Sequence, residues 1–135
     1  MRVNIRRNGE RLNFKASNYG SGYAIVDGET ESDGMRPMEL LLSALGTCAA
    51  FDIVKILEKQ RQEVRDVQID ITGDRSEDGY PNPFTKILLD FRIYGFVDEA
   101  KANRAVTLAV DKYCSVRDSL SPDIVIEHRL EIIEQ

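Results

Sequence analysis

The sequence predicts an α+β fold with the element order βββ-α-ββ-α(α)-β. Apolar and polar residues alternate with a period of two near both ends of the chain and in its middle, which is typical of strands. An apolar segment that begins at Pro37 and continues to about Gln60 predicts one long helix. A second stretch with helical spacing, residues 99–113, predicts another helix between two strands.

The first quarter of the chain predicts a hairpin followed by a third strand. Apolar and polar residues alternate over residues 3–5 and 12–16, on either side of the turn signal Asn8-Gly9. A third strand is expected over residues 23–26, and a polar loop over residues 28–36.

The long helix has an unusual distribution of apolar residues. Proline is favourable at the first helical position, and no further proline interrupts the segment. Its first two-thirds is apolar nearly all round, which is typical of a helix that is enclosed on most sides. Lys55, Lys59 and Arg61 suit the negative end of the helix dipole.

The rest of the chain predicts two strands, two helices and a last strand, over residues 64–73, 84–94, 99–113, 115–120 and 124–132. Ile87, Leu89, Phe91 and Ile93 form one apolar face of the second of these strands. Because no linker interrupts the order of elements, we expect a single domain over residues 1–135.

Composition excludes several classes of protein. The chain has 135 residues, 42% hydrophobic and 30% charged, which is the mix of a soluble globular domain. The longest apolar stretch, residues 40–51, is interrupted by polar residues and ends at Asp52, so no membrane span is expected. The first residues carry no apolar signal segment, and we therefore expect a cytoplasmic protein. A net charge of −5 argues against a nucleic-acid partner.

Residues that could carry chemistry are few. The chain contains no phosphate-binding loop, no dinucleotide fingerprint and no HExxH zinc motif. Two cysteines are too few for a disulfide framework, and together with His128 they are too few for a four-ligand zinc site. For His128, which stands in an alternating strand, we expect a structural or surface role.

Cys48 and Cys114 remain, and they stand 66 residues apart. Free cysteine often behaves as a small buried hydrophobic residue, so inert thiols and a redox pair are both open. Arg117, Lys112 and the start of a short helix at residue 115 would all lower the pKa of the Cys114 thiol. Cys48 has Asp52 four residues on, a like-charged neighbour for a thiolate. These residues by themselves nominate Cys114 as the more reactive thiol.

The segments GMRPMELLLSALGTCAAFDIVKIL (residues 34–57) and KYCSV (residues 112–116) resemble the OsmC/Ohr family, the osmotically inducible and organic-hydroperoxide-resistance proteins. The specific features are Gly34, Pro37, and a run of small residues that ends in a cysteine eleven residues after the proline. The resemblance covers essentially the whole chain and is nearer to the OsmC-like branch of poorly defined activity than to the well-marked peroxidases.

The resemblance implies an intertwined homodimer in which two long central helices pack together and sheets from both chains wrap them. Cys48 would attack an organic hydroperoxide and Cys114 would resolve the sulfenic acid to a disulfide. An external dithiol, on a lipoyl or thioredoxin-like protein, would reduce that disulfide, so neither a cofactor nor a metal is expected.

The sequence departs from the family at two supporting positions. The family glutamate follows the proline directly, and here that position is Met38. Glu39 is nine residues from Cys48, on the opposite face of a straight helix, and is expected to support the helix N-terminus. The family also has an arginine in its N-terminal region, for which Arg11, Arg7 and Arg36 are candidates by location.

A second hypothesis is a non-catalytic binding module. In it, the dimer interface holds a small apolar ligand in a cleft lined by Leu41, Leu45, Phe51 and Tyr113. The cysteines would then be part of the cleft wall, and the methionine at position 38 favours this reading.

Overall fold

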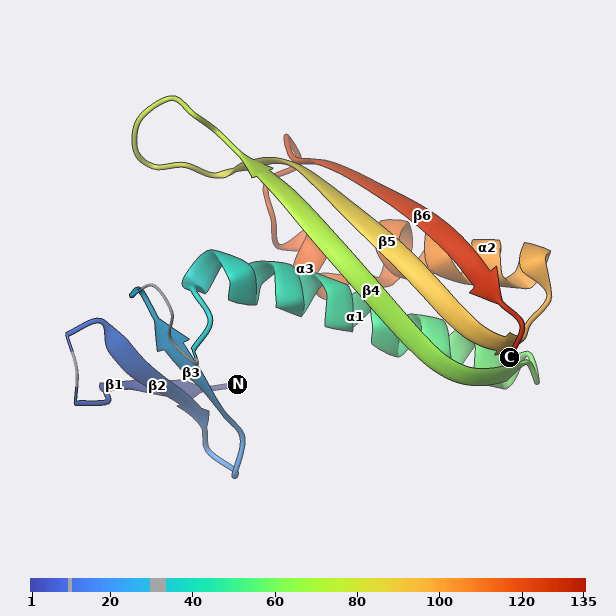
Figure 1. Ribbon diagram of the computed structural model, residues 1–135, viewed down its shortest axis with the longest axis horizontal. Coiled ribbons are helices and arrows are strands. Elements are labelled where there is room, and N and C mark those ends of the chain that lie inside the picture. Colours follow the sequence, from blue (N-terminus) through green and yellow to red (C-terminus); the bar gives the residue numbers. More distant parts are fainter. Residues whose placement is uncertain (10, 30–33) are drawn as a thin grey trace. The chain divides into compact units, whose positions relative to one another are not determined.

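The computed structural model describes residues 1–9, 11–29 and 34–135, which form two compact units, Met1–Leu41 and Leu42–Gln135 (Figure 1). Part of the expected polar loop, residues 30–33, lies outside the described residues. The expectation of a single domain stays a prediction.

The first unit contains a three-stranded antiparallel sheet. Its strands are β1 (Val3–Arg7), β2 (Asn13–Asn18) and β3 (Tyr23–Asp27), in that order. Ile5 pairs with Ala16, which in turn pairs with Ala24. The predicted hairpin and third strand are confirmed.

Helix α1 spans Pro37–Lys59, close to the predicted bounds. Its buried side chains lie at a spacing of four residues and form one stripe: Leu45, Ala49, Ile53 and Leu57. Phe51, on another side, is 65% exposed. The expectation of a helix enclosed on most sides is therefore wrong for the chain alone, because the sheet of the second unit offers the helix one apolar face.

By length and composition α1 is also sufficient to cross a membrane. Its apolar 18-residue window has a mean hydropathy of 1.9, and 28% of that window is buried. The core helix of a soluble protein passes the same test, so this is weak evidence for a span. The shorter stretch considered in the sequence, residues 40–51, is part of this longer helix, and the absence of a membrane partner stays a prediction.

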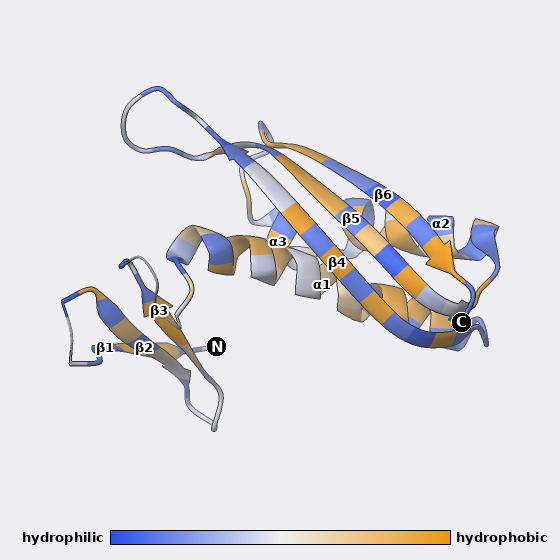
Figure 2. Cartoon of the chain, viewed as in Figure 1, coloured by the Kyte–Doolittle hydropathy of each residue, from blue (hydrophilic) through white to orange (hydrophobic). Residues whose placement is uncertain are grey.

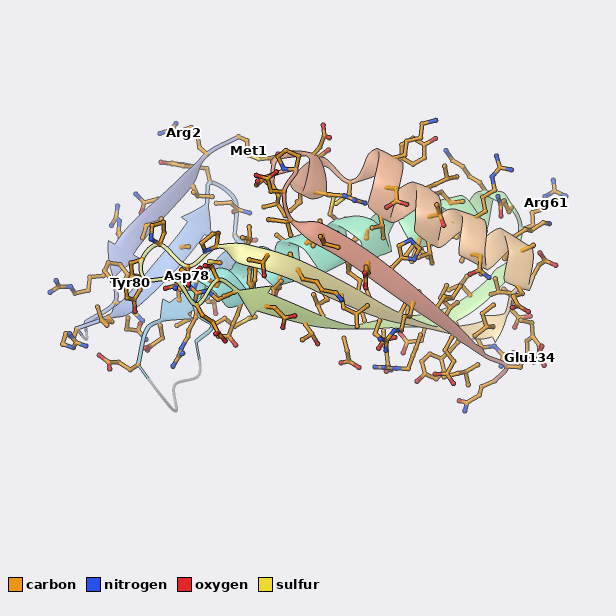
Figure 3. The ribbon with its side chains drawn as sticks, turned by 90° about the horizontal axis from the view of Figure 1, so that it is seen from above. Met1, Arg2, Arg61, Asp78, Tyr80 and Glu134 are labelled. Carbon is orange, nitrogen blue, oxygen red and sulfur yellow. The ribbon has the colours of Figure 1, made fainter. Side chains whose placement is uncertain are left out.

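The second unit contains a sheet of three long strands in the order β4 (Glu63–Arg75), β5 (Phe84–Phe96) and β6 (Val125–Ile133). β4 and β5 are antiparallel, whereas β5 and β6 are parallel and are joined by the helical segment between them. Between α1 and β4 the chain turns at Arg61, which has a φ of 56° and a side chain that projects outward (Figure 3).

The core of this unit lies on one face of the sheet. Ile87, Leu89, Phe91 and Ile93 of β5 are at most 1% exposed, as the alternation predicts. The other face carries ion pairs such as Arg92–Asp70 and Lys86–Glu127. Figure 2 shows the resulting alternation of apolar and polar residues along the strands, and α1 and α2 lie on the apolar side (Figure 1).

The predicted helix over residues 99–113 is divided into an α-helix and a π-helix. The α-helix α2 spans Glu99–Leu108, and Asp98 caps it by accepting a 3.0 Å hydrogen bond from the Lys101 amide. Ala109–Tyr113 then form a π-helix, η1, before the short helix α3, Ser115–Asp118. Apolar periodicity cannot reveal this change, because Ala109 and Val110 are buried and continue the apolar stripe of α2.

Candidate active site

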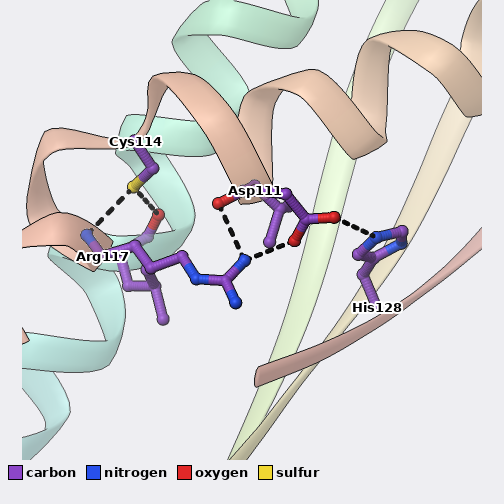
Figure 4. Close-up of polar contacts among 6 residues, drawn as sticks. Asp111, Cys114, Arg117 and His128 are labelled. Atoms are coloured by element: carbon purple, nitrogen blue, oxygen red, sulfur yellow. Dashed lines mark hydrogen bonds and ion pairs between the residues drawn. The ribbon is translucent and has the colours of Figure 1, made fainter. Parts of the chain in front are cut away.

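Cys114 is the residue at which the chain passes from η1 to α3. Its backbone is extended, with φ −75° and ψ 105°, and its side chain caps α3. The sulfur accepts a 3.3 Å hydrogen bond from the Arg117 amide and lies 4.0 Å from the carbonyl oxygen of Leu45 in α1 (Figure 4). Cys114 is 4% exposed, so its thiol is packed between α3 and α1.

Cys48 lies on the same helix as Leu45, three residues later and thus about one turn along it. It is half-buried, and both cysteines are free thiols. A hydrogen bond with the Cys48 side chain and the charge of Cys48 both raise the pKa of Cys114, so the two side chains are neighbours. The fold thus brings together the two candidate residues that are far apart in the sequence.

The electrostatic expectation for Cys114 is corrected by the structure. Burial raises the pKa of the Cys114 thiol, because a thiolate loses solvation there. The amides of Arg117 and Val116 act in the opposite direction, and the net pKa is still above the ordinary value. The prediction that its sequence neighbours lower the pKa of Cys114 is therefore wrong in sign, since sequence spacing does not show burial.

The guanidinium of Arg117 is engaged elsewhere. Its Nη1 donates to the Val110 carbonyl at 3.1 Å and forms an ion pair with Asp111 (Figure 4). The other carboxylate oxygen of Asp111 lies 3.9 Å from Nε2 of His128 on β6. Sequence spacing does not reveal this network, because Asp111 and His128 come near Arg117 through the π-helix and the parallel strand.

Comparison with known proteins supports the resemblance in the sequence. A family model described as OsmC-like protein matches residues 28–129. The chain belongs to the OsmC-like family. Protein YhfA from Escherichia coli (strain K12) is 37% identical to this OsmC-like chain over 125 residues, which is 92% of each protein.

Solved structures show the same fold. A hypothetical protein from Aquifex aeolicus VF5 is 29% identical, with a TM-score of 0.87, and the match covers 99% of this chain and 96% of that one. The organic hydroperoxide resistance protein OhrB of Bacillus subtilis has a TM-score of 0.69 over 97% of this chain and 98% of its own, at 15% identity. The latter likeness shows that the two proteins share a fold, and the predicted α+β, OsmC-like fold class is confirmed.

The candidate supporting residues of the OsmC-like chain lie in the first unit. Arg11 is exposed and paired with Glu29 at 2.9 Å. Glu39 accepts a 2.9 Å hydrogen bond from the Arg36 amide, one half of a capping box at the start of α1. The expectation that Glu39 supports this helix end is confirmed, whereas any action of Arg11, Arg36 or Glu39 on a thiol stays a prediction.

Two of the hollows in the second unit border residues that the sequence singles out. A pocket of about 400 Å³ borders Cys114 and includes Arg117, Leu120 and Ile124 among its walls. A groove of about 490 Å³ between α1 and β4 is lined by Phe51 and Val54 among others. Leu45, expected to line a ligand cleft, is instead 1% exposed, because it points into the core.

The described residues, 1–9, 11–29 and 34–135, include no group of three or more histidine, cysteine and acidic side chains that could hold a metal ion.

Proposed function

We propose that this OsmC-like protein is a thiol-dependent hydroperoxide reductase in which Cys48 attacks the peroxide and Cys114 resolves the product. The observation that supports the proposal most strongly is the adjacency of the two free thiols, with Cys114 packed against the α1 turn that precedes Cys48. Membership of a family with a solved relative named organic hydroperoxide resistance protein supports the substrate class.

The division of roles follows from burial and charge. A hydroperoxide must reach the attacking sulfur, and Cys48 is the less buried of the two residues. Cys114 is nearly inaccessible, and its raised pKa leaves less thiolate at neutral pH. A resolving thiol needs no contact with substrate, only with the sulfur that has been oxidised.

In the proposed reaction, the Cys48 thiolate attacks the distal oxygen of the hydroperoxide. The O–O bond breaks, Cys48 becomes a sulfenic acid, and the alkoxide takes up a proton and leaves as an alcohol. The Cys114 sulfur then displaces hydroxide from Cys48, which forms a disulfide and releases water after proton transfer. An external dithiol reduces the disulfide by two exchange steps and becomes a disulfide itself.

We further propose that the protein is a homodimer. Phe51 on α1 is 65% exposed and borders the groove with β4, so it presents an apolar side chain to solvent. A second copy would remove this apolar surface from water. The cytoplasmic location expected from the sequence remains part of this proposal.

Peroxide turnover tests the function directly. Purified protein is mixed with cumene or tert-butyl hydroperoxide and a dithiol such as dithiothreitol or dihydrolipoamide, and peroxide consumption is followed. We expect turnover in the native protein, loss to the background level in Cys48→Ser, and native turnover in the control Thr47→Ser, an exposed neighbour on α1. Equal rates for the native protein and Cys48→Ser would exclude the proposal.

Binding of a small apolar ligand is the second candidate function, and the groove between α1 and β4 favours it. Native mass spectrometry of protein prepared from several hosts would detect a bound lipid or acyl compound. A bound compound that Phe51→Ser releases would support this function, and an empty protein in every preparation would exclude it.

A further inference from the structure

The position of the Cys114 sulfur depends on a short and irregular piece of chain. Cys114 is one extended residue between the π-helix η1 and the four-residue helix α3. The end of a helix leaves carbonyl groups without partners inside the helix. The Cys114 thiol therefore keeps one orientation only if hydrogen bonds or an ion pair hold the end of η1 to the start of α3.

Arg117 makes this connection. Its backbone amide donates to the Cys114 sulfur at 3.3 Å, on the α3 side of the thiol. Its guanidinium donates to the carbonyl of Val110 at 3.1 Å and pairs with the Asp111 carboxylate, on the η1 side (Figure 4). One residue thus fixes the chain both before and after Cys114.

The connection is also anchored to the sheet. The Arg117 side chain is 30% exposed, so its charge-assisted hydrogen bonds are partly shielded from water. The second oxygen of Asp111 lies 3.9 Å from Nε2 of His128 on β6. Lys112, the other cation beside Cys114 in sequence, instead lies over the ring of Tyr113 at 5.5 Å.

We propose that Arg117 is a positioning residue for the second step of the reaction: it holds the Cys114 thiol toward Cys48, so that a sulfenic acid on Cys48 is closed rapidly to the disulfide. The inference rests on the proposed function and adds a residue to it. Arg117 does not touch the peroxide, so the rate at which Cys48 is oxidised is independent of it.

The substitution Arg117→Gln separates these steps. It removes the guanidinium contacts with Val110 and Asp111 and retains the backbone amide that caps Cys114. A displaced nucleophile loses one to two orders of magnitude in an intramolecular reaction, so we expect disulfide closure to slow about ten- to a hundred-fold. Oxidation of Cys48 should keep its native rate.

The experiment is a single turnover with one equivalent of cumene hydroperoxide, in the presence of dimedone to trap sulfenic acid. Peptide mass spectrometry measures the dimedone adduct on Cys48 and the Cys48–Cys114 cross-link over time. We expect little adduct in the native protein and a predominant adduct in Arg117→Gln, with equal peroxide consumption in the first turnover. Arg117→Lys should restore closure in part, because an ammonium can donate to Val110 or Asp111 without the bidentate fork.

Arg129→Gln is the matched control, since Arg129 is an exposed arginine on β6 whose nearest carboxylate, Asp90, is 3.9 Å away. It should behave as the native protein does. Native disulfide closure in Arg117→Gln, without extra dimedone adduct, would overturn the inference. Asp111→Asn gives a second test if Arg117→Gln does not fold, because it keeps Arg117 and weakens the ion pair that holds its guanidinium. Native disulfide closure in Asp111→Asn would count equally against the inference.

A failure of the proposed function is distinguishable from a failure of this inference. If hydroperoxide leaves Cys48 reduced in the native protein, the proposed function fails. Diamide then drives closure of the same two thiols without peroxide, and the ratio of the closure rates of native protein and Arg117→Gln decides the role of Arg117. Slower closure in the variant supports the positioning role, and equal rates exclude it.

Discussion

The sulfur of Cys114 lies 4.0 Å from the carbonyl oxygen of Leu45, three residues before Cys48 on the same helix. Within the second unit, this contact joins the segment between β5 and β6 to α1. It also explains why Cys114 is buried although it stands in a connection between helices, where side chains are commonly exposed.

Replacing the resolving thiol should change the fate of oxidised Cys48. In Cys114→Ser, one equivalent of hydroperoxide is still consumed, but no partner sulfur closes the disulfide, so sulfenic acid persists and excess peroxide carries it to sulfinic acid. We expect steady-state turnover with dihydrolipoamide to fall at least about tenfold, and mass spectrometry to show oxygen added at Cys48. Native turnover in Cys114→Ser, or no oxygen added at Cys48 after hydroperoxide treatment, would contradict the assigned order.

The raised pKa of Cys114 predicts how this thiol responds to pH. Burial and Cys48 both raise this pKa, so the ultraviolet thiolate absorbance of Cys114, taken as the difference between the native protein and Cys114→Ser, should rise with a midpoint above about 8.5, the value of a free cysteine. A midpoint at or below that of a cysteine peptide measured alongside would contradict the burial argument.

The same pKa has a consequence for stability. Because the folded protein holds the Cys114 proton more strongly than the unfolded chain does, the stabilisation is complete below the unfolded pKa and is lost as pH rises through the folded one. Urea unfolding should show the native protein losing stability relative to Cys114→Ala above about pH 8.5. A difference between the two proteins that stays constant or grows with pH would be inconsistent with this sign.

Gly95 should tolerate no side chain. Its φ is 136°, and an added Cβ would lie 2.1 Å from the backbone oxygen of Glu63, where β4 has an irregular register. We expect Gly95→Ala to lower the free energy of unfolding by about 3 kcal/mol. Gly79→Ala is the control: its φ of 72° brings strain, but nothing lies within 4 Å, so the loss should be about 1 kcal/mol. Equal losses at both positions would show that the contact with Glu63 does not matter.

The proposed dimer predicts a specific weak point on α1. Phe51 is 65% exposed beside the groove with β4. Burying a charged side chain at this position against a second copy would cost desolvation free energy. We expect Phe51→Glu to weaken the dimer at least about tenfold in analytical ultracentrifugation. Tyr80→Glu, at a side chain that is 95% exposed between β4 and β5, serves as the control. A native protein that sediments as a monomer at high concentration would remove the basis of this prediction.

Local patterns were sufficient for most of the fold. Asn8-Gly9 and the alternation around it predicted the hairpin, Pro37 predicted the start of α1, and the apolar face of β5 was buried as expected. These features depend on residues close in sequence, whose spacing matches the period of the element they form. The motif around Cys48 likewise indicates the family from local sequence alone.

Other properties were decided by tertiary structure. The sequence predicted a lowered pKa for Cys114, because cations and a helix start are its neighbours in sequence, but burial raises that pKa. Likewise, the Asp111 contacts with Arg117 and His128 depend on a π-helix and on a parallel strand pairing that periodicity does not encode. Solvation and long-range contacts depend on which distant segments pack together, and for this protein that packing determined the environment of both sulfur atoms.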